Sequence, residues 1–402
     1  MRAAKECFPT SEYWRRRVST KQSSDRWIVG RLVQRAERPN RGASHRFRDI
    51  GGIGVDEKSP SRERLSLAGR TVEKGRTMIR TRLTKLFNIE HPIILAPMTP
   101  AAGAGLSTAV AAAGGLGLLG GGYGDRAWFE TESAKITRND VGCGFITWSV
   151  AKQPELLDFA IERHPRAIML SFADPAPFAK RIKQARVPLI CQVHTVDQAR
   201  RAADVGADVV VAQGTEAGGH GQTARSTLPF VPTVVDALSN YAPDVVVVAA
   251  GGIADGRGLA AALMLGAEGA LMGSRFWATK EALIHPSAKA KVVAASGDET
   301  IRTSVYDIVR QRAWPEGYTG RLLKNEFIEK WHGHEEKLRA LQADELEKVE
   351  AASRVGDFDV ANVTVGESIG MIHDLPAAGD VVRRVVAETK VRLAKYDRAS
   401  LE

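Results

Sequence analysis

A single histidine lies inside a glycine-rich segment, Gly214-Thr-Glu-Ala-Gly-Gly-His-Gly221, which directly follows the apolar run 208–213. An imidazole exchanges a proton near neutral pH, and glycines allow a backbone to approach a ligand closely. The segment therefore indicates proton transfer by His220 beside a ligand that Gly218 and Gly219 contact. The alternative interpretation is an ordinary turn with a solvent-exposed histidine.

Two further glycine segments stand at the ends of apolar runs. Gly251 and Gly252 follow one run, and Gly273 and Ser274 close another. Glycine amides and a helix N-terminus together bind phosphate. Because both segments have this placement, phosphate binding is favoured over two unrelated turns. Asp255, just beyond the first pair, is expected to cap a helix.

Uncharged residues at other strand ends complete the candidate site. Ala96, Pro97 and Met98 are too apolar for acid–base work, but they suit packing under a flat ring. Thr147 and Gln192 offer uncharged hydrogen-bonding groups toward the same opening. The alternative for all five residues is ordinary core packing, with the polar groups satisfied by backbone.

Other motifs are absent from the sequence. It contains no HExxH, no paired carboxylates and no GxSxG, which argues against metalloproteases, glycosidases and α/β-hydrolases. No metal site is predicted. His194, two residues beyond Gln192, is a weaker candidate than His220, and the remaining histidines lack comparable placement.

Eight short apolar runs, bounded by Gly, Pro or Asp, must position these residues. They occupy residues 92–98, 117–120, 141–147, 167–172, 188–193, 208–213, 245–250 and 269–273. Near-continuous apolar runs are typical of strands covered on both faces, as in parallel sheets. Helical segments between them predict an α/β fold, a (β/α)8 TIM barrel. An open doubly wound sheet usually has fewer strands and an early dinucleotide fingerprint.

The pattern changes after the eighth run. We predict the barrel over residues 78–280, and over 281–402 a smaller helical cap with C-terminal helices that return to the barrel. Residues 280–335 show mixed helical patterns, residues 335–353 form a charged helix, and residues 380–394 form an amphipathic helix. Residues 1–77 are predicted to be a disordered basic extension.

The net charge of +9 arises in that extension, which carries 19 Lys or Arg and nine Asp or Glu. The extension is interpreted as a basic tail, a transit peptide or translated sequence upstream of a start at Met78. The acidic residues argue against a transit peptide. Nucleic-acid binding through the extension is a minor alternative. The rest of the chain is nearly neutral, so no nucleic-acid partner is predicted.

Three cysteines without paired or metal-ligand spacing predict neither a disulfide framework nor a zinc site, and they favour a cytoplasmic location. Residues 92–124 contain no charged side chain, but nine glycines and three prolines interrupt them. No membrane span is therefore predicted. The oligomeric state is left open between monomer and homodimer.

The chain resembles the nitronate monooxygenase family, formerly called 2-nitropropane dioxygenases, which are FMN-dependent TIM-barrel enzymes. The resemblance covers about residues 78–394. Four segments carry it in matching order and spacing: 92–98, 216–221, 250–255 and 269–275.

The resemblance implies an FMN site. Ala96, Pro97 and Met98 would contact the isoalloxazine, and Thr147 and Gln192 would bond its polar edge. The phosphate would be held by Gly218, Gly219, Gly251, Gly252, Gly273 and Ser274.

The resemblance also implies a reaction. Alkyl nitronates, such as propionate 3-nitronate, would be oxidised by dioxygen to a carbonyl compound and nitrite, with His220 as the base. Such activity would serve nitroalkane detoxification. FMN-dependent NAD(P)H reductases, acting on enoyl-acyl-carrier proteins or quinones, share the Gly-Gly-His motif and remain the alternative.

Overall fold

The computed structural model describes residues 78–395 of the chain. The predicted basic extension, residues 1–77, lies outside the described residues, as do residues 396–402.

Eight parallel strands form the central sheet, in the order β1-β9-β8-β6-β5-β4-β3-β2. Each overlaps one of the eight predicted apolar runs. The strands are β1 (Ile93–Leu95), β2 (Gly117–Gly120), β3 (Val141–Ile146), β4 (Ile168–Ser171), β5 (Leu189–Val193), β6 (Val209–Gln213), β8 (Val246–Ala250) and β9 (Ala270–Met272).

The two edge strands of this sheet meet and close it into a barrel. The Leu95 N–H donates to Leu116 O at 2.9 Å, and the Leu116 N–H donates to Ile93 O at 2.9 Å. The predicted (β/α)8 barrel is confirmed.

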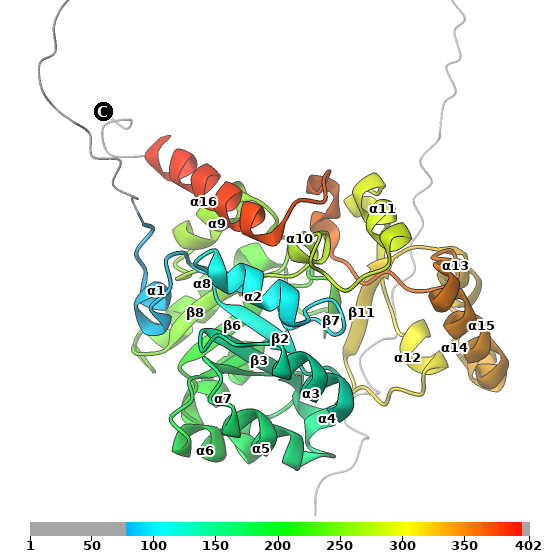
Figure 1. Cartoon of the computed structure of the whole chain (residues 1–402), viewed down its shortest axis with the longest axis horizontal. Helices are drawn as coiled ribbons and strands as arrows, with labels where there is room; N and C mark the ends of the chain where they lie inside the picture. The colour runs from blue at the N-terminus through cyan, green and yellow to red at the C-terminus, as the bar shows by residue number, and fades with distance from the viewer. Residues whose placement is uncertain (1–77, 396–402) are drawn as a thin grey trace, which may run out of the picture. The chain divides into compact units, whose positions relative to one another are not determined.

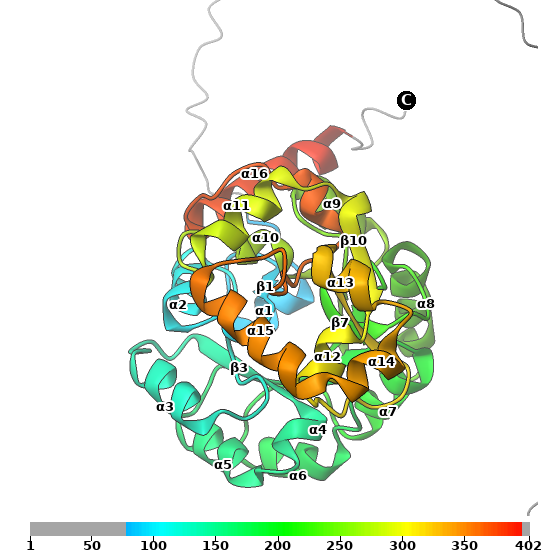
Figure 2. The ribbon, with the colours of Figure 1, turned by 90° about the vertical axis from the view of Figure 1, so that its right-hand side faces the viewer.

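Helices surround the barrel as a ring (Figure 2). They are α2 (Ala104–Ala112), α3 (Arg126–Ala134), α4 (Thr147–Val150), α5 (Pro154–Glu162), α6 (Ala176–Gln184), α7 (Val196–Asp204), α8 (Thr227–Ser239), α9 (Gly256–Met264) and α16 (Ala378–Lys395). Capping residues and glycines determine where several of these helices begin and end. Thr195 and Asp255 accept hydrogen bonds as N-caps, and Gly206 and Gly266 have φ of +86° and +89° after their helices.

The barrel strands bury side chains on both faces, as their apolar runs predicted. In β6, Val209 and Val211 belong to the inner cluster, whereas Val210 belongs to the outer cluster that packs against the helices. Leu83 and Phe87 of the short helix α1 (Arg82–Phe87) join the inner cluster. Hydrophobic burial on two layers therefore holds the strand ends that carry the site.

The last helix, α16, returns to the barrel and packs between α9 and α2. Its Glu388 carboxylate accepts a hydrogen bond from the Gly256 N–H of α9 at 2.9 Å. The buried Thr389 hydroxyl donates to Gly256 O of α9 and to Val385 O of α16 itself. Helix α16 thus takes the place of the helix that would follow the eighth strand.

The segment between β9 and α16 forms a cap at one end of the barrel (Figure 1). Its elements are α10 (Ser274–Trp277), α11 (Pro286–Ala294), η1 (Gly297–Glu299), β10 (Thr300–Thr303), α12 (Val305–Val309), β11 (Tyr318–Leu323), α13 (Glu326–Trp331), α14 (Glu335–Ala340), α15 (Gln342–Val355) and η2 (Glu367–Met371). The expected charged helix over 335–353 is split at Leu341 into α14 and α15.

A three-stranded antiparallel sheet within this region was not predicted from sequence. Its order is β10-β11-β7, and β7 (Gly219–Gln222) is part of the glycine segment that follows β6. The predicted boundary at residue 280 stays a prediction, and this sheet joins residues on both sides of it. No helix among residues 78–395 is long and apolar enough to cross a membrane.

Docking of α16 can be tested with two valines of that helix. Val382 is fully buried, whereas Val391 is 69% exposed. Val382→Ala is expected to lower the free energy of unfolding by about 2 kcal/mol through lost apolar burial and the cavity left behind. Val391→Ala should change it by less than about 0.5 kcal/mol. Urea unfolding followed by circular dichroism measures both, and equal effects would contradict the docking.

Candidate active site

A cavity of about 660 Å³ lies where the barrel strands end and the cap begins. This volume is within the range of cofactor and substrate sites. Eleven of the twelve site residues expected from sequence line it: Ala96, Pro97, Met98, Gln192, Gly218, Gly219, His220, Gly251, Gly252, Gly273 and Ser274.

Thr147 is the expected residue that does not line the cavity. It is the first residue of α4, directly after β3, and its side chain is buried. Its hydroxyl has no hydrogen-bond partner among the described residues. The neighbouring Ile146 and Phe145 line the cavity instead.

His220 projects from β7 and is held by a carboxylate from the cap. Its Nε2 lies 2.9 Å from both carboxylate oxygens of Asp307 in α12. Both side chains are largely buried, with 19% and 13% of their surfaces exposed. A carboxylate at Nε2 keeps the N–H on that nitrogen and leaves the lone pair on Nδ1. A histidine that accepts a proton at Nδ1 while a carboxylate holds its Nε2 needs this arrangement.

Several aromatic side chains lie around the His220–Asp307 pair. The Trp314 ring stacks on His220 with centroids 3.6 Å apart and planes within 8° of parallel. Its indole N–H donates to the Tyr123 hydroxyl at 3.1 Å. Burial, with a contribution from Asp307, raises the pKa of Tyr123 to about 12, so this hydroxyl keeps its proton. Phe172 packs edge-on to Trp314 with a left-handed φ of +72°.

The glycines provide close backbone approaches that side chains would block. Gly251 and Gly252 have φ of +103° and +72°, which L-residues rarely adopt. A Cβ at Gly218 would lie 2.4 Å from the Gly366 nitrogen, with no room to move. The loops after β6 and β8 are thus brought together with the chain around Gly366, which also donates to Ser274 Oγ at 2.8 Å.

These residues fit a cofactor that carries a flat ring and a phosphate. The Gln192 Nε2 is buried and has no hydrogen-bond partner in residues 78–395, so a ligand in the cavity would supply the acceptor it lacks. Ala96, Pro97 and Met98 provide an apolar wall, and Gly251 with Gly273 provide backbone close to the cavity.

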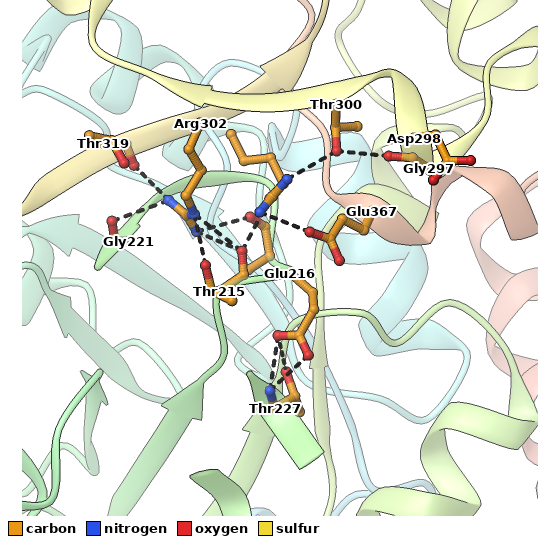
Figure 3. Close-up of polar contacts among 12 residues, drawn as sticks. Thr215, Glu216, Gly221, Thr227, Gly297, Asp298, Thr300, Arg302, Thr319 and Glu367 are labelled. Atoms are coloured by element: carbon orange, nitrogen blue, oxygen red, sulfur yellow. Dashed lines mark hydrogen bonds and ion pairs between the residues drawn. The ribbon is translucent and has the colours of Figure 1, made fainter. Parts of the chain in front are cut away.

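Arg302 of β10 holds the glycine segment on both sides of His220 (Figure 3). Its guanidinium donates to Thr215 O at 3.0 Å, Gly221 O at 3.2 Å and Thr319 O at 2.8 Å, and also to the Thr215 hydroxyl at 3.1 Å. Burial, reinforced by nearby Arg321, lowers the pKa of Arg302 to about 10. We call this set of contacts the arginine clamp.

Two neighbouring contacts extend the arginine clamp (Figure 3). Arg321 donates to Thr215 O at 3.1 Å and pairs with the Glu367 carboxylate at 2.8 Å. On the barrel side, the Glu216 carboxylate accepts from the backbone N–H and the hydroxyl of Thr227. The segment from Thr215 to Gly221 is therefore tied to the cap and to α8.

His194 is buried outside the residues that line the cavity. Its ring stacks on Phe172 with centroids 6.1 Å apart, and neither ring nitrogen has a hydrogen-bond partner in the described part of the chain. Burial, assisted by the charge of Arg302, lowers the pKa of His194 to about 3. This histidine is therefore neutral at physiological pH.

Sequence reasoning missed several residues that line the cavity. Phe172 directly follows β4, so its strand-end placement was available as a signal. Asp307, Arg310 and Trp314 come from the cap, where no strand-end rule applies. Among residues 78–395, no group of three or more His, Cys, Asp or Glu side chains is arranged to hold a metal ion.

Comparison with known proteins agrees with this geometry. A family model described as nitronate monooxygenase matches residues 80–140 and 145–388. The chain belongs to the nitronate monooxygenase family. A nitronate monooxygenase of Neurospora crassa is 32% identical over 361 residues, covering 78% of this chain and 94% of that protein.

Related proteins with other names also match. A (3aS,4S,5R,7aS)-5-hydroxy-7a-methyl-1-oxo-octahydro-1H-indene-4-carboxyl-CoA dehydrogenase of Mycobacterium tuberculosis is 34% identical over 255 residues, covering 63% of this chain and 68% of that protein. The solved structure of FabK from Thermotoga maritima superposes with a TM-score of 0.68 and 31% identity, covering 79% and 98% of the two chains. This member of the nitronate monooxygenase family is thus an oxidoreductase, and its family implies a flavin.

Removing the arginine clamp should destabilise this family member. Arg302→Met is expected to lower the free energy of unfolding by about 3 kcal/mol, because several partly buried carbonyl oxygens lose their donors. Arg200→Met is the control, since Arg200 is an exposed residue of α7 that lies 4.0 Å from its ion-pair partner. It should change stability by less than about 0.5 kcal/mol. Indistinguishable urea unfolding curves for the two variants would contradict the clamp.

Proposed function

We propose that the chain is an FMN-dependent nitronate monooxygenase. It oxidises alkyl nitronates, such as propionate 3-nitronate, with dioxygen to a carbonyl compound and nitrite, in keeping with nitroalkane detoxification. The observation that carries the proposal is the His220–Asp307 pair at a cavity lined by the family's expected cofactor residues.

His220 acts as the base when the substrate arrives as a neutral nitroalkane. The α-carbon of a nitroalkane is acidic, and the Nδ1 lone pair accepts its proton, leaving a nitronate anion. The resulting imidazolium keeps its Nε2 hydrogen bond to the Asp307 carboxylate, which stabilises the added charge. The Trp314 face stacked on the ring favours the cation further.

The residues proposed to bind FMN fall into two groups, one for the ring system and one for the phosphate. Ala96, Pro97 and Met98 would contact the ring system of FMN, and the free amide of Gln192 would bond its polar edge. Thr147 was also expected at that edge, although it does not line the cavity. The phosphate would be held by Gly218, Gly219, Gly251, Gly252, Gly273 and Ser274. When bound, FMN supplies the electron transfer that amino-acid side chains do not provide.

The partners are then a small nitronate and dioxygen, with neither nucleic acid nor membrane involved. A cytoplasmic location and a monomeric or homodimeric state remain predictions.

An NAD(P)H-dependent reductase is the second candidate. It is favoured by the similarity to the Mycobacterium tuberculosis protein, whose name is that of a dehydrogenase. The two candidates differ in what they consume. The monooxygenase consumes dioxygen with a nitronate and needs no nicotinamide, whereas the reductase oxidises NADH or NADPH.

Cofactor uptake tests the proposed site. The purified chain should show a flavin absorption spectrum, and Gly218→Ala should weaken FMN binding at least about tenfold, because its Cβ meets the Gly366 backbone. Gly105→Ala is the control, since a Cβ at Gly105 contacts nothing within 4 Å. A colourless protein that cannot take up FMN contradicts the flavin proposal. NADH oxidation with a quinone, without nitronate-dependent oxygen consumption, would favour the reductase.

Replacing His220 should affect the kcat/KM of neutral nitroalkanes more than that of preformed nitronates. His220→Asn is expected to lower kcat/KM for neutral nitroalkanes about 10²- to 10⁴-fold, the usual contribution of a general base. Preformed nitronates need no deprotonation, so their loss should be much smaller. His164→Asn, an exposed position at φ +48° that Asn tolerates, should leave both rates unchanged. Equal losses with nitroalkanes and nitronates would contradict the role of His220, as measured by oxygen consumption.

A further inference from the structure

The charged side chains that line the cavity are not balanced within it. They are Glu216, Asp307, Arg310 and Arg312. Both carboxylates already have partners, since Glu216 accepts from Thr227 and Asp307 is paired with His220. Neither arginine forms an ion pair with a carboxylate in the described residues. The two guanidinium groups are therefore the charges left for a ligand.

Arg310 is the more enclosed of the two. It directly follows α12 and is partly buried, whereas Arg312 is exposed and lies over the Tyr123 ring. One Arg310 N–H donates to the Asn362 side-chain oxygen at 2.5 Å, and the guanidinium lies 5.4 Å from the centre of the Tyr306 ring. Both partners are uncharged, and most of the five guanidinium N–H groups remain available.

Arg310 forms no ion pair, and Asp307, the carboxylate whose charge acts on it, is engaged with His220. A partly buried cation in this situation is costly, so its position at a cavity indicates a ligand. Burial lowers the pKa of Arg310, but a guanidinium remains protonated in proteins. Its planar fork matches a carboxylate in a bidentate arrangement. We propose that Arg310 binds a carboxylate of the substrate and so selects nitronates with an anionic tail. This rests on the proposed function above.

The spacing along α12 agrees with a short substrate. Asp307, which holds the base, and Arg310 are three residues apart, which corresponds to about 4.5 Å of rise along a helix. Residues three apart lie on the same helix face. A substrate whose reacting carbon adjoins His220 and whose carboxylate is one or two carbons away spans a comparable length. Propionate 3-nitronate has this form.

The kinetic test compares two nitronates of similar shape. In 3-methylbutyl-1-nitronate an uncharged isopropyl group replaces the carboxylate of propionate 3-nitronate. Arg310→Met should raise KM for propionate 3-nitronate about 10- to 100-fold, the value of a charged hydrogen bond, with little change in kcat. KM for the uncharged analogue should stay within about twofold. Arg310→Lys should recover part of the loss.

A cap arginine outside the cavity provides the control. Arg339→Met removes an exposed charge from α14 and should leave both KM values unchanged. If Arg310→Met raises the two KM values equally, or raises neither, the carboxylate role is wrong.

A binding measurement keeps this proposal separate from the proposed reaction. Succinate should bind the FMN-loaded chain, and Arg310→Met should weaken that binding at least about tenfold in calorimetric titration. Succinate binding that depends on Arg310, without turnover of any nitronate, would overturn the proposed reaction and support the anion site. Nitronate turnover with succinate binding unaffected by Arg310→Met would do the reverse. Inorganic phosphate that binds Arg310 more tightly than succinate would also overturn the carboxylate assignment.

Discussion

The site depends on the contacts that Arg302 makes with the segment after β6. Four of the eight residues from Gly214 to Gly221 are glycines, so buried side chains do little to determine the path of this segment. One guanidinium donates to Thr215, Gly221 and Thr319 and thereby fixes the backbone before and after His220 (Figure 3). The glycines allow the backbone to approach a ligand closely. The Arg302 hydrogen bonds restrict the conformations of the backbone that carries His220.

The barrel and the cap contribute different parts of one cavity. Strand ends bring glycine backbone and small apolar residues, which suit a cofactor. The cap brings Asp307 and Trp314, which contact His220, and Arg310, which lines the same cavity. His220 and Asp307 are 87 residues apart in sequence, yet they meet at 2.9 Å. Both the barrel and the cap are thus needed to complete the cavity.

The sequence was sufficient for the barrel, because each buried parallel strand is a continuous apolar run bounded by turn residues. It was insufficient for β7, β10 and β11, whose pairing joins distant segments through backbone hydrogen bonds and carries little apolar pattern. Asp307 was not predicted for the same reason, since the pairing of β7, β11 and β10 brings α12 to His220. Thr147 lies one residue beyond β3, where the chain already turns into α4, and it is not among the residues that line the cavity.

The return of α16 to the barrel bears on how the chain is assembled during synthesis. The ring of helices stays open between α9 and α2 until residues 378–395 have left the ribosome. Every cap element precedes them, so the cap is complete before the barrel wall is. A nascent chain therefore exposes the apolar flanks of α9 and α2 until α16 has emerged, and this interval is open to aggregation and to chaperone binding.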